Sequence, residues 1–272
     1  MKRYPAVLSI AGFDGSGGAG IQADHKAIAA TGGYGMSVLT AIAVQNTCGV
    51  KSVFPIPVEV VKEQLWTILE DIQTDCIKIG MVHSCELAKL IFKTLQQFSD
   101  IPVVFDPVMV STSGHPLILE ETIQTLKQTL IPQAELITPN LDEAAILANM
   151  PIQTLEDMQV AGEKIMQSGC KALLLKGGHL AAEQLTSLLF QKGKAVQDFT
   201  FPKIATQNTH GSGCTLSSAI ASFRAQGNTL EEAVKLGMLY VQEAIEQGKD
   251  VQTGHGNGPL NHFFNPIKAK IL

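Results

Sequence analysis

Residues 208–215 read Asn-Thr-His-Gly-Ser-Gly-Cys-Thr, and a helix-like run follows from Leu216 to Gln226. Gly211 and Gly213 allow a tight turn, from which the first free N–H groups of the helix converge on a negative oxygen. The helix dipole adds to that attraction. Cys214 lies in the same first turn, where a thiol ionises more easily than in water. A phosphate cradle that contains a base predicts phosphoryl transfer, although a loop that only caps a helix has the same local sequence.

Short apolar runs alternate with helix-like segments along the chain, which predicts a parallel sheet covered on both faces. The strands are expected at Ala6–Ala11, Cys76–Ile79, Val103–Phe105, Glu135–Ile137 and Ala172–Leu175. Apolar spacing of three or four residues predicts helices at Glu59–Ile72, Glu86–Phe98, Glu120–Thr129, Leu141–Ala148 and Leu155–Ser168. No linker or repeat marks a boundary, so residues 1–272 are expected to form a single domain.

Two stretches depart from this rhythm. Tyr34–Val44 and Ser52–Pro57 resemble added strands, and Ser187–Phe190 with Val196–Phe199 resembles a hairpin. The last helices are expected at Thr215–Gln226 and Leu230–Gln247.

Polar residues follow several of the expected strands. Asp106, Asn140 with Glu143, and Lys176 come after three of them. Ligands of such sheets bind at the carboxyl ends of the strands. This edge is therefore predicted to bind a polyanion together with a divalent cation.

The overall charge and cysteine content exclude other classes. The net charge is −5 and no basic cluster occurs, which argues against a nucleic-acid partner. The five cysteines are spread without a Cys-x-x-Cys pair, which disfavours a disulfide framework or a structural zinc site. The uncharged run 27–50 contains glycines, amides and hydroxyls and is no membrane span. We expect a soluble, cytoplasmic protein.

Residues 15–20 formally match the G-x-G-x-x-G dinucleotide fingerprint. A dinucleotide site also needs an acid about 20 residues further on, and no Asp or Glu occurs between Asp24 and Glu59. No glycine run ends in Gly-Lys-Ser/Thr, which excludes a P-loop. A nucleotide site must therefore rest on the turn at 211–213.

Nine motifs distributed over nearly the full length make the chain similar to a known family. They are Ile10–Gly12, Gly17–Asp24, Ala43–Thr47, Lys78–Met81, Asp106–Met109, Ile137–Asn140, Leu175–His179, Asn208–Thr215 and Gly256–Phe263. In this order they resemble the ribokinase superfamily and, within it, the hydroxymethylpyrimidine/phosphomethylpyrimidine kinases of thiamine biosynthesis. The resemblance implies a three-layer α/β/α sandwich with a mostly parallel central sheet. It also implies a homodimer that uses ATP and Mg²⁺.

The resemblance assigns substrate contacts to five positions. Asp24 lies near the substrate hydroxymethyl group and Gln45 pairs with the aminopyrimidine edge, as an amide that both donates and accepts can do. Met81 and Val108 form apolar walls against the ring, although ordinary core packing explains each equally well. Gly12 belongs to the same substrate side.

On the phosphate side, the resemblance implies that Asp106 and Glu143 hold Mg²⁺, a hard ion that prefers oxygen ligands. Glu143 is also placed as a helix N-terminal acid favoured by the dipole, and the two roles can coexist. Lys176 neutralises the ATP phosphates. The remaining nucleotide contacts come from Asn140, Thr209, Gly211, Ser212 and Gly213.

The implied reaction is an in-line attack of the substrate hydroxymethyl oxygen on the γ-phosphorus of ATP. Cys214 helps to remove the proton, while Lys176 and the N–H groups of residues 211–214, including Gly211 and Gly213, stabilise the phosphoryl charge.

Two positions depart from the family pattern. Phe13 replaces a small residue of the first loop and brings a large apolar group to the substrate side. Ser187 replaces an aspartate before the hairpin strand, which alters a nucleotide-side contact. The histidines His179, His210, His255 and His262 are expected to be structural or to fix loops.

Two alternatives stay open. A pyridoxine/pyridoxal kinase acts on another flat heteroaromatic hydroxymethyl compound, and only Gln45 and Phe13 separate the two readings. A non-catalytic ligand-binding protein on a kinase scaffold is disfavoured because Lys176, Cys214 and the glycines at 211 and 213 are all present.

Overall fold

The computed structural model describes residues 2–109, 118–178 and 183–272. In this part of the chain nine strands form one sheet in the order β3-β2-β1-β4-β5-β6-β7-β8-β9. The strands are β1 (Ala6–Asp14), β2 (Tyr34–Asn46), β3 (Gly49–Pro55), β4 (Cys76–Ile79), β5 (Val103–Phe105), β6 (Leu136–Ile137), β7 (Ala172–Leu175), β8 (Gln184–Gln191) and β9 (Gln197–Pro202).

The six central strands β2, β1, β4, β5, β6 and β7 are parallel. At the edges the pairing is antiparallel, between β2 and β3 on one side and between β7, β8 and β9 on the other. The helices are α1 (Gly20–Ala30), α2 (Val58–Asp71), α3 (Cys85–Gln97), α4 (Glu120–Gln128), α5 (Leu130–Gln133), α6 (Leu141–Ala148), α7 (Leu155–Gln167), α8 (Ser212–Ala225) and α9 (Leu230–Glu246).

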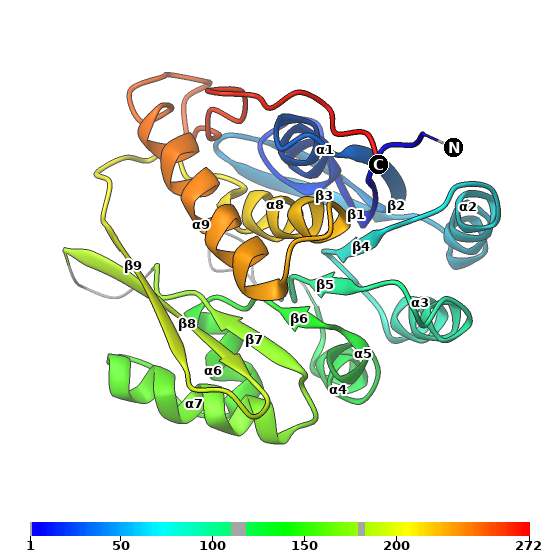
Figure 1. Ribbon diagram of the computed structural model, residues 1–272, viewed down its shortest axis with the longest axis horizontal. Helices are drawn as coiled ribbons and strands as arrows, with labels where there is room; N and C mark the ends of the chain where they lie inside the picture. The colour runs from blue at the N-terminus through cyan, green and yellow to red at the C-terminus, as the bar shows by residue number, and fades with distance from the viewer. Residues whose placement is uncertain (1, 110–117, 179–182) are drawn as a thin grey trace.

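Helices cover both faces of the sheet (Figure 1). Helices α1, α8 and α9 pack on one face around Val7, Ile28 and Ile220, and α2 to α7 pack on the other around Leu8, Ile91 and Ile165. Successive residues of β1 feed opposite cores because side chains alternate along a strand. The predicted three-layer sandwich with a mostly parallel sheet is confirmed.

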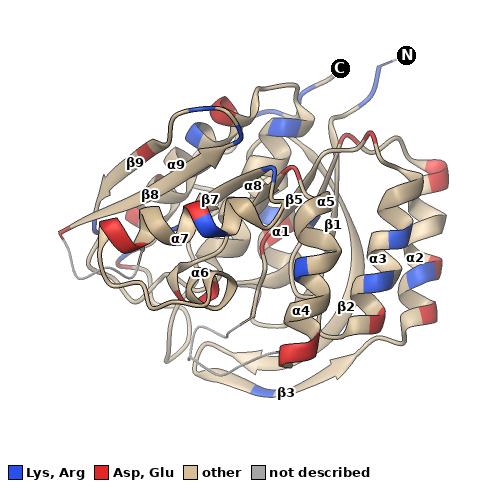
Figure 2. Cartoon of the chain, turned by 90° about the horizontal axis from the view of Figure 1, so that it is seen from below, with Lys and Arg blue, Asp and Glu red and all other residues tan. Residues whose placement is uncertain are grey.

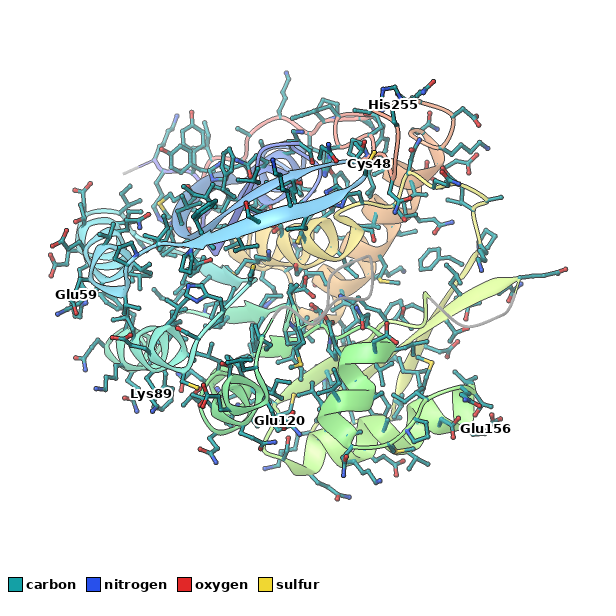
Figure 3. All side chains as sticks on the ribbon, turned by 180° about the vertical axis from the view of Figure 1, so that it is seen from behind. Cys48, Glu59, Lys89, Glu120, Glu156 and His255 are labelled. Carbon is teal, nitrogen blue, oxygen red and sulfur yellow. The ribbon has the colours of Figure 1, made fainter. Side chains whose placement is uncertain are left out.

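The helices on the α2–α7 side of the sheet carry many of the charged residues. Charged residues recur along α2, α3 and α4 (Figure 2), and Glu59, Lys89, Glu120 and Glu156 point away from the sheet (Figure 3). None of the helices in the described ranges is long and apolar enough to cross a membrane.

The predicted boundaries are wrong at three functionally relevant places. Strand β1 continues past Ala11 to Asp14, because β2 goes on pairing with it beyond a register shift. Helix α8 begins at Ser212 rather than Thr215. Strand β8 begins at Gln184 rather than Ser187, since its pairing with β9 extends to Pro202.

Candidate active site

The turn before α8 lies directly against the first glycine-rich loop, residues 15–20. Gly211 has a φ of 78°, and a Cβ there would lie 1.8 Å from the backbone oxygen of Gly18. Only glycine tolerates both this left-handed conformation and this close approach. The two glycine loops therefore pack directly against each other, although they are about 190 residues apart in the sequence.

The first turn of α8 presents fewer free N–H groups than predicted. The N–H of Ser212 donates to the oxygen of Thr209 at 3.1 Å, and that of Thr215 donates to Gly211 at 2.9 Å. Of the predicted donors 211–214, Ser212 is therefore occupied. Among the described residues, Gly211, Gly213 and Cys214 keep N–H groups without a backbone acceptor, and these are the donors available to an anion.

Asp14 ties the two loops together. Its carboxylate accepts hydrogen bonds from the N–H groups of Ser16, Gly18 and Ala19 at 2.7–3.1 Å, and His210 Nε2 lies 2.9 Å from Oδ2. Burial would raise the pKa of Asp14, but its hydrogen bonds, led by those from His210 and Ser16, hold it well below its usual range. The prediction that His210 fixes a loop is confirmed, whereas Asp14 was not identified from the sequence.

Lys176 and Asp106 form an ion pair beside Gly213, at the start of α8. Lys176 Nζ lies 2.9 Å from Asp106 Oδ1, and Thr138 Oγ1 donates to the same oxygen at 3.0 Å. A Cβ on Gly213 would lie 3.2 Å from that Nζ and 3.5 Å from Asp106 Oδ2. Glycine at 213 thus lets both charges approach the N-terminus of α8.

Burial lowers the pKa of Lys176, but the neighbouring carboxylates of Asp106 and Glu143 outweigh it, so the net shift is upward. The ammonium therefore stays charged beside the helix N-terminus.

Asn140 and Glu143 begin α6 as a reciprocal capping box. The Asn140 side chain accepts from the Glu143 N–H at 2.9 Å, and Glu143 Oε2 accepts from the Asn140 N–H at 2.9 Å. Glu143 Oε1 also accepts from Met109 N–H at 3.3 Å. Burial raises the pKa of Glu143 to about 7, although the charge of Lys176 opposes that shift. Glu143 therefore has the structural role that its position after Asn140 predicted.

The two carboxylates suit a hard cation. Within the described ranges no three His, Cys, Asp or Glu side chains are grouped to hold a metal by themselves. Mg²⁺ usually takes one or two carboxylates and completes its shell with water and substrate phosphate. Asp106 Oδ2, which faces Gly213, and the buried Glu143 fit that pattern.

Cys214 lies in the first turn of α8, as predicted. The expectation that this position eases its ionisation is wrong. Desolvation raises the pKa of Cys214 to about 11, outweighing the charge of Lys78 and a hydrogen bond from the Gly20 N–H, which both lower it. The thiol is therefore protonated at neutral pH.

The predicted substrate residues occupy neighbouring strand ends. Gly12 on β1 faces Met81 after β4, since a Cβ at 12 would lie 3.7 Å from the Met81 sulfur. Gln45 on β2 is half-buried and is one of the groups that lower the pKa of Asp14 by hydrogen bonding. Val108 is half-buried just after Asp106. Thr209 is exposed before the anion turn.

Asp24 does not lie where a substrate could touch it. Its side chain has 0% exposure and both oxygens bind Lys78 Nζ at 2.9 Å. The prediction of a direct contact with the hydroxymethyl group is corrected accordingly. Lys78 itself was not identified, although a lysine inside the apolar run 76–79 signals a buried counter-ion.

The two departures from the family pattern have structural surroundings. Phe13 pairs in register with Ile42 of β2, and Ile42 pairs with Phe54 of β3. Ser187 is buried and its hydroxyl accepts the N–H of Gly177 at 3.4 Å. It therefore supports the loop that carries Lys176. Their effects on substrate and nucleotide contacts stay predictions, and His179 lies outside the described residues.

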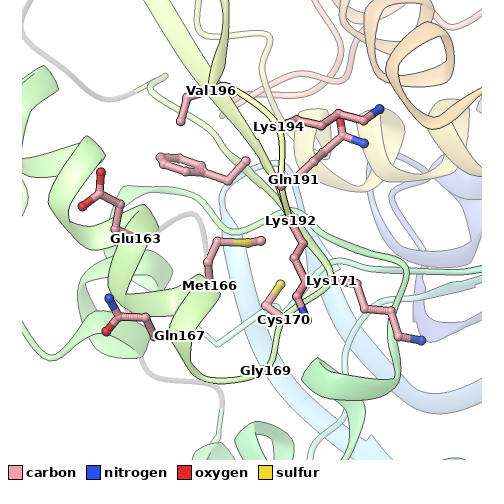
Figure 4. Close-up of a pocket in the computed structure, with 12 residues that line it drawn as sticks. Glu163, Met166, Gln167, Gly169, Cys170, Lys171, Gln191, Lys192, Lys194 and Val196 are labelled. Atoms are coloured by element: carbon pink, nitrogen blue, oxygen red, sulfur yellow. The ribbon is translucent and has the colours of Figure 1, made fainter.

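A separate hollow of about 730 Å³ lies at the opposite end of β7 (Figure 4). Met166, Phe190 and Val196 give it an apolar wall, and lysines lie around them. Its one thiol, Cys170, donates to the oxygen of Ala172, and burial raises its pKa to about 12. This thiol is inert, so the hollow does not resemble a second reaction centre.

Comparison with known proteins shows which family the chain is similar to. The family model for phosphomethylpyrimidine kinase matches residues 14–261. The hydroxymethylpyrimidine/phosphomethylpyrimidine kinase of Escherichia coli (strain K12) is 44% identical over 264 residues, which are 97% of this chain and 98% of that protein.

Two solved structures show the same likeness. The phosphomethylpyrimidine kinase of Clostridium difficile 630 is 43% identical, with a TM-score of 0.78 over 88% of this chain and 99% of that one. The ADP complex of Bacillus subtilis pyridoxal kinase is 35% identical, with a TM-score of 0.89 over 96% and 98%. With a family model over most of its length and such relatives, the chain belongs to the phosphomethylpyrimidine kinase family.

Proposed function

We propose that the protein transfers the γ-phosphoryl group of ATP to hydroxymethylpyrimidine and then to its monophosphate, giving the diphosphate used in thiamine biosynthesis. The observation that carries this proposal is the Lys176–Asp106 pair, which is held against free N–H groups at the start of α8 beside Cys214. The family name and the relative from Escherichia coli support the choice of substrate.

In the proposed reaction Cys214 first gives up its own proton to solvent, and the resulting thiolate takes the proton of the substrate hydroxyl as the hydroxyl oxygen bonds to the γ-phosphorus. The bond from that phosphorus to the β-phosphate oxygen breaks, and ADP leaves with the electron pair. The N–H groups of Gly211, Gly213 and Cys214 and the ammonium of Lys176 hold the phosphoryl oxygens. Gly12, Gln45, Met81 and Val108 would contact the pyrimidine.

The oxygen of Asp106 that faces Gly213 and the carboxylate of Glu143 would hold Mg²⁺, directly or through water. When bound, that ion neutralises phosphate charge. The chain's own contribution is to keep both carboxylates oriented, through Thr138 and through the capping box of α6.

A mass-resolved assay with ATP and Mg²⁺ tests the proposal. It offers hydroxymethylpyrimidine, its monophosphate and pyridoxine in parallel. Pyrimidine diphosphate is the expected product. Absence of phosphoryl transfer to every substrate would overturn the kinase proposal and favour a binding protein.

A vitamin B6 kinase is the second candidate, because the TM-score of 0.89 with the pyridoxal kinase exceeds that with the pyrimidine kinase structure. Phosphorylation of pyridoxine alone in the same assay would select it. The Phe13→Ser variant then shows whether the large side chain sets the preference, since a shift of kcat/KM between the two substrates is expected only in that case.

We further propose a homodimer in the cytoplasm. Phe13, Ile42, Val44 and Phe54 form an apolar strip, 36–58% exposed, next to the edge strand β3. Sedimentation should give a dimer, and Phe54→Lys a monomer; a monomeric wild-type protein would contradict it. All five cysteines are free thiols, which suits a reducing compartment.

A further inference from the structure

Lys78 is a charged residue in the middle of the core. It lies on β4 between Ile77 and Ile79, and all three side chains have 0% exposure. A buried ammonium persists only with a counter-charge. Asp24 on α1 supplies it, with both carboxylate oxygens 2.9 Å from Nζ.

Two hydroxyls complete the shell of Asp24. Ser9 Oγ of β1 donates to Oδ2 at 2.6 Å, and Ser218 Oγ of α8 donates to Oδ1 at 2.8 Å. Ser218 is four residues after Cys214, so the two side chains lie on the same face of α8. The ion pair is thus hydrogen-bonded to α8 one turn after Cys214.

The site of the ammonium is confined on the side of Gly80. A Cβ at that position would lie 2.9 Å from Lys78 Nζ, so glycine leaves room for the charge. This confinement and the bonds of Asp24 fix the ammonium in one place.

Charged groups from several elements act electrostatically on the Cys214 thiol. They are Lys78 of β4, Asp24 of α1, Asp106 after β5 and Lys176 after β7. Of these charges, Lys78 has the largest effect in lowering the Cys214 pKa, and the aspartates raise it. Burial lowers the pKa of Lys78 itself, but Asp24 and its other anionic neighbours more than compensate.

We propose that Lys78, held by Asp24, Ser9 and Ser218, is a positioning residue that stabilises the Cys214 thiolate from beneath the active site. Asp24 fixes the ammonium in place and, together with Asp106, keeps it charged. Lys78 is sealed from substrate, so it acts through Cys214 and not by contact. The inference rests on the proposed function only in giving that thiolate its task as the base.

The test compares two variants that differ by a single charge, D24N and D24N/K78M. We would follow the rate of alkylation of Cys214 by iodoacetamide from pH 6 to 11, because below the pKa this rate is proportional to the thiolate fraction. Peptide mass spectrometry resolves this thiol from the other four. In D24N the ammonium keeps Asp106 as an anionic neighbour and the nearest anion is gone, so the apparent pKa of Cys214 should fall below that of the wild type. D24N/K78M should raise it above D24N by about one unit or more.

Activity gives a second readout. The kcat of D24N/K78M should fall about tenfold or more, with the loss reduced at high pH. A purely structural pair would leave the alkylation profile unmoved, and an unchanged profile in both variants overturns the proposal. Because alkylation needs no substrate, a shifted profile without kinase activity would sink the proposed function and keep this inference.

A distant ion pair provides the matched control. Arg224, in the last turn of α8 and so at the opposite end of this helix from Cys214, binds Glu135 near Cys76. E135Q and E135Q/R224M should leave the Cys214 profile unchanged. If D24N does not fold, D24N/K78M is compared with the wild type, and a lower or equal pKa in this neutral variant overturns the proposal.

Discussion

Two lysine–aspartate pairs of the same length flank Cys214, and their surroundings give them different roles. Lys78 and Asp24 are 2.9 Å apart with 0% exposure of either side chain. Lys176 and Asp106 are also 2.9 Å apart, but Lys176 is 15% exposed. The sealed pair can act only through neighbouring groups, whereas the open pair can exchange one partner for a phosphate. Access to ligand, rather than the chemistry of the pair, separates positioning from binding.

The residue between the pairs should show the largest effect. Cys214→Ser should lower kcat about 10²–10⁴-fold, because the hydroxyl is a much weaker acid than the thiol and general base catalysis contributes that much. Thermal unfolding should change little. Steady-state kinetics and circular dichroism measure both, and unchanged turnover would remove Cys214 from the chemistry.

Breaking the sealed pair should destabilise the protein. Lys78→Met leaves Asp24 as an uncompensated buried charge, which lowers the free energy of unfolding by about 3–5 kcal/mol. Urea denaturation measures it. Lys62→Met is the control, since Lys62 is 54% exposed and its pair with Glu59 is loose. Equal stability of both variants would contradict the difference between the pairs.

Breaking the open pair should instead damage catalysis. Lys176→Met should lower kcat/KM about 10²–10³-fold, since one preorganised charge on the phosphoryl group is lost. Its effect on stability should be smaller than that of Lys78→Met, because Asp106 keeps the hydroxyl of Thr138. The control is Lys171→Met, whose exposed side chain lies at the other end of β7. A larger loss of stability than of activity would reverse our assignment.

The buried side chain of His262, which has no countercharge within the described ranges, should make the stability of the protein depend on pH. Burial lowers the pKa of His262 from 6.5 to about 4, so the unfolded chain binds more protons between these values. Stability is therefore full above pH 6.5 and is lost as the pH falls towards 4, by about 3 kcal/mol in total. Urea titrations of His262→Gln should lack this component, whereas those of the exposed His255→Gln should keep it.

Loss of the contact between His210 and Asp14, which joins the two glycine loops, should give the smallest effect. His210→Asn removes the contact with Asp14, which keeps its three backbone N–H donors. We expect the KM for ATP to rise about tenfold, the effect of losing roughly one charged hydrogen bond, with little change in kcat. A fall in kcat at constant KM would show that His210 acts on the reaction itself.

The sequence alone predicts most of the frame. Apolar runs of four to six residues and helical spacing locate the central strands, because burial imposes those periods locally. The glycine turn, Cys214, Lys176 and Asp106 are also identified, since the carboxyl ends of parallel strands meet at one edge. One domain over residues 1–272 stays a prediction.

Only the tertiary structure decided how deeply these groups are buried and which charges lie beside them. Lys78 and Asp24 are 54 residues apart, and Asp14 and His210 are 196 apart, so no local pattern joins either pair. The pKa of Cys214 likewise depends on desolvation and on the charges of Lys78, Asp24 and Asp106, and burial raises it where the sequence predicted easier ionisation. Periodicity is a local property of the chain, whereas burial and counter-charge exist only after distant segments have packed together.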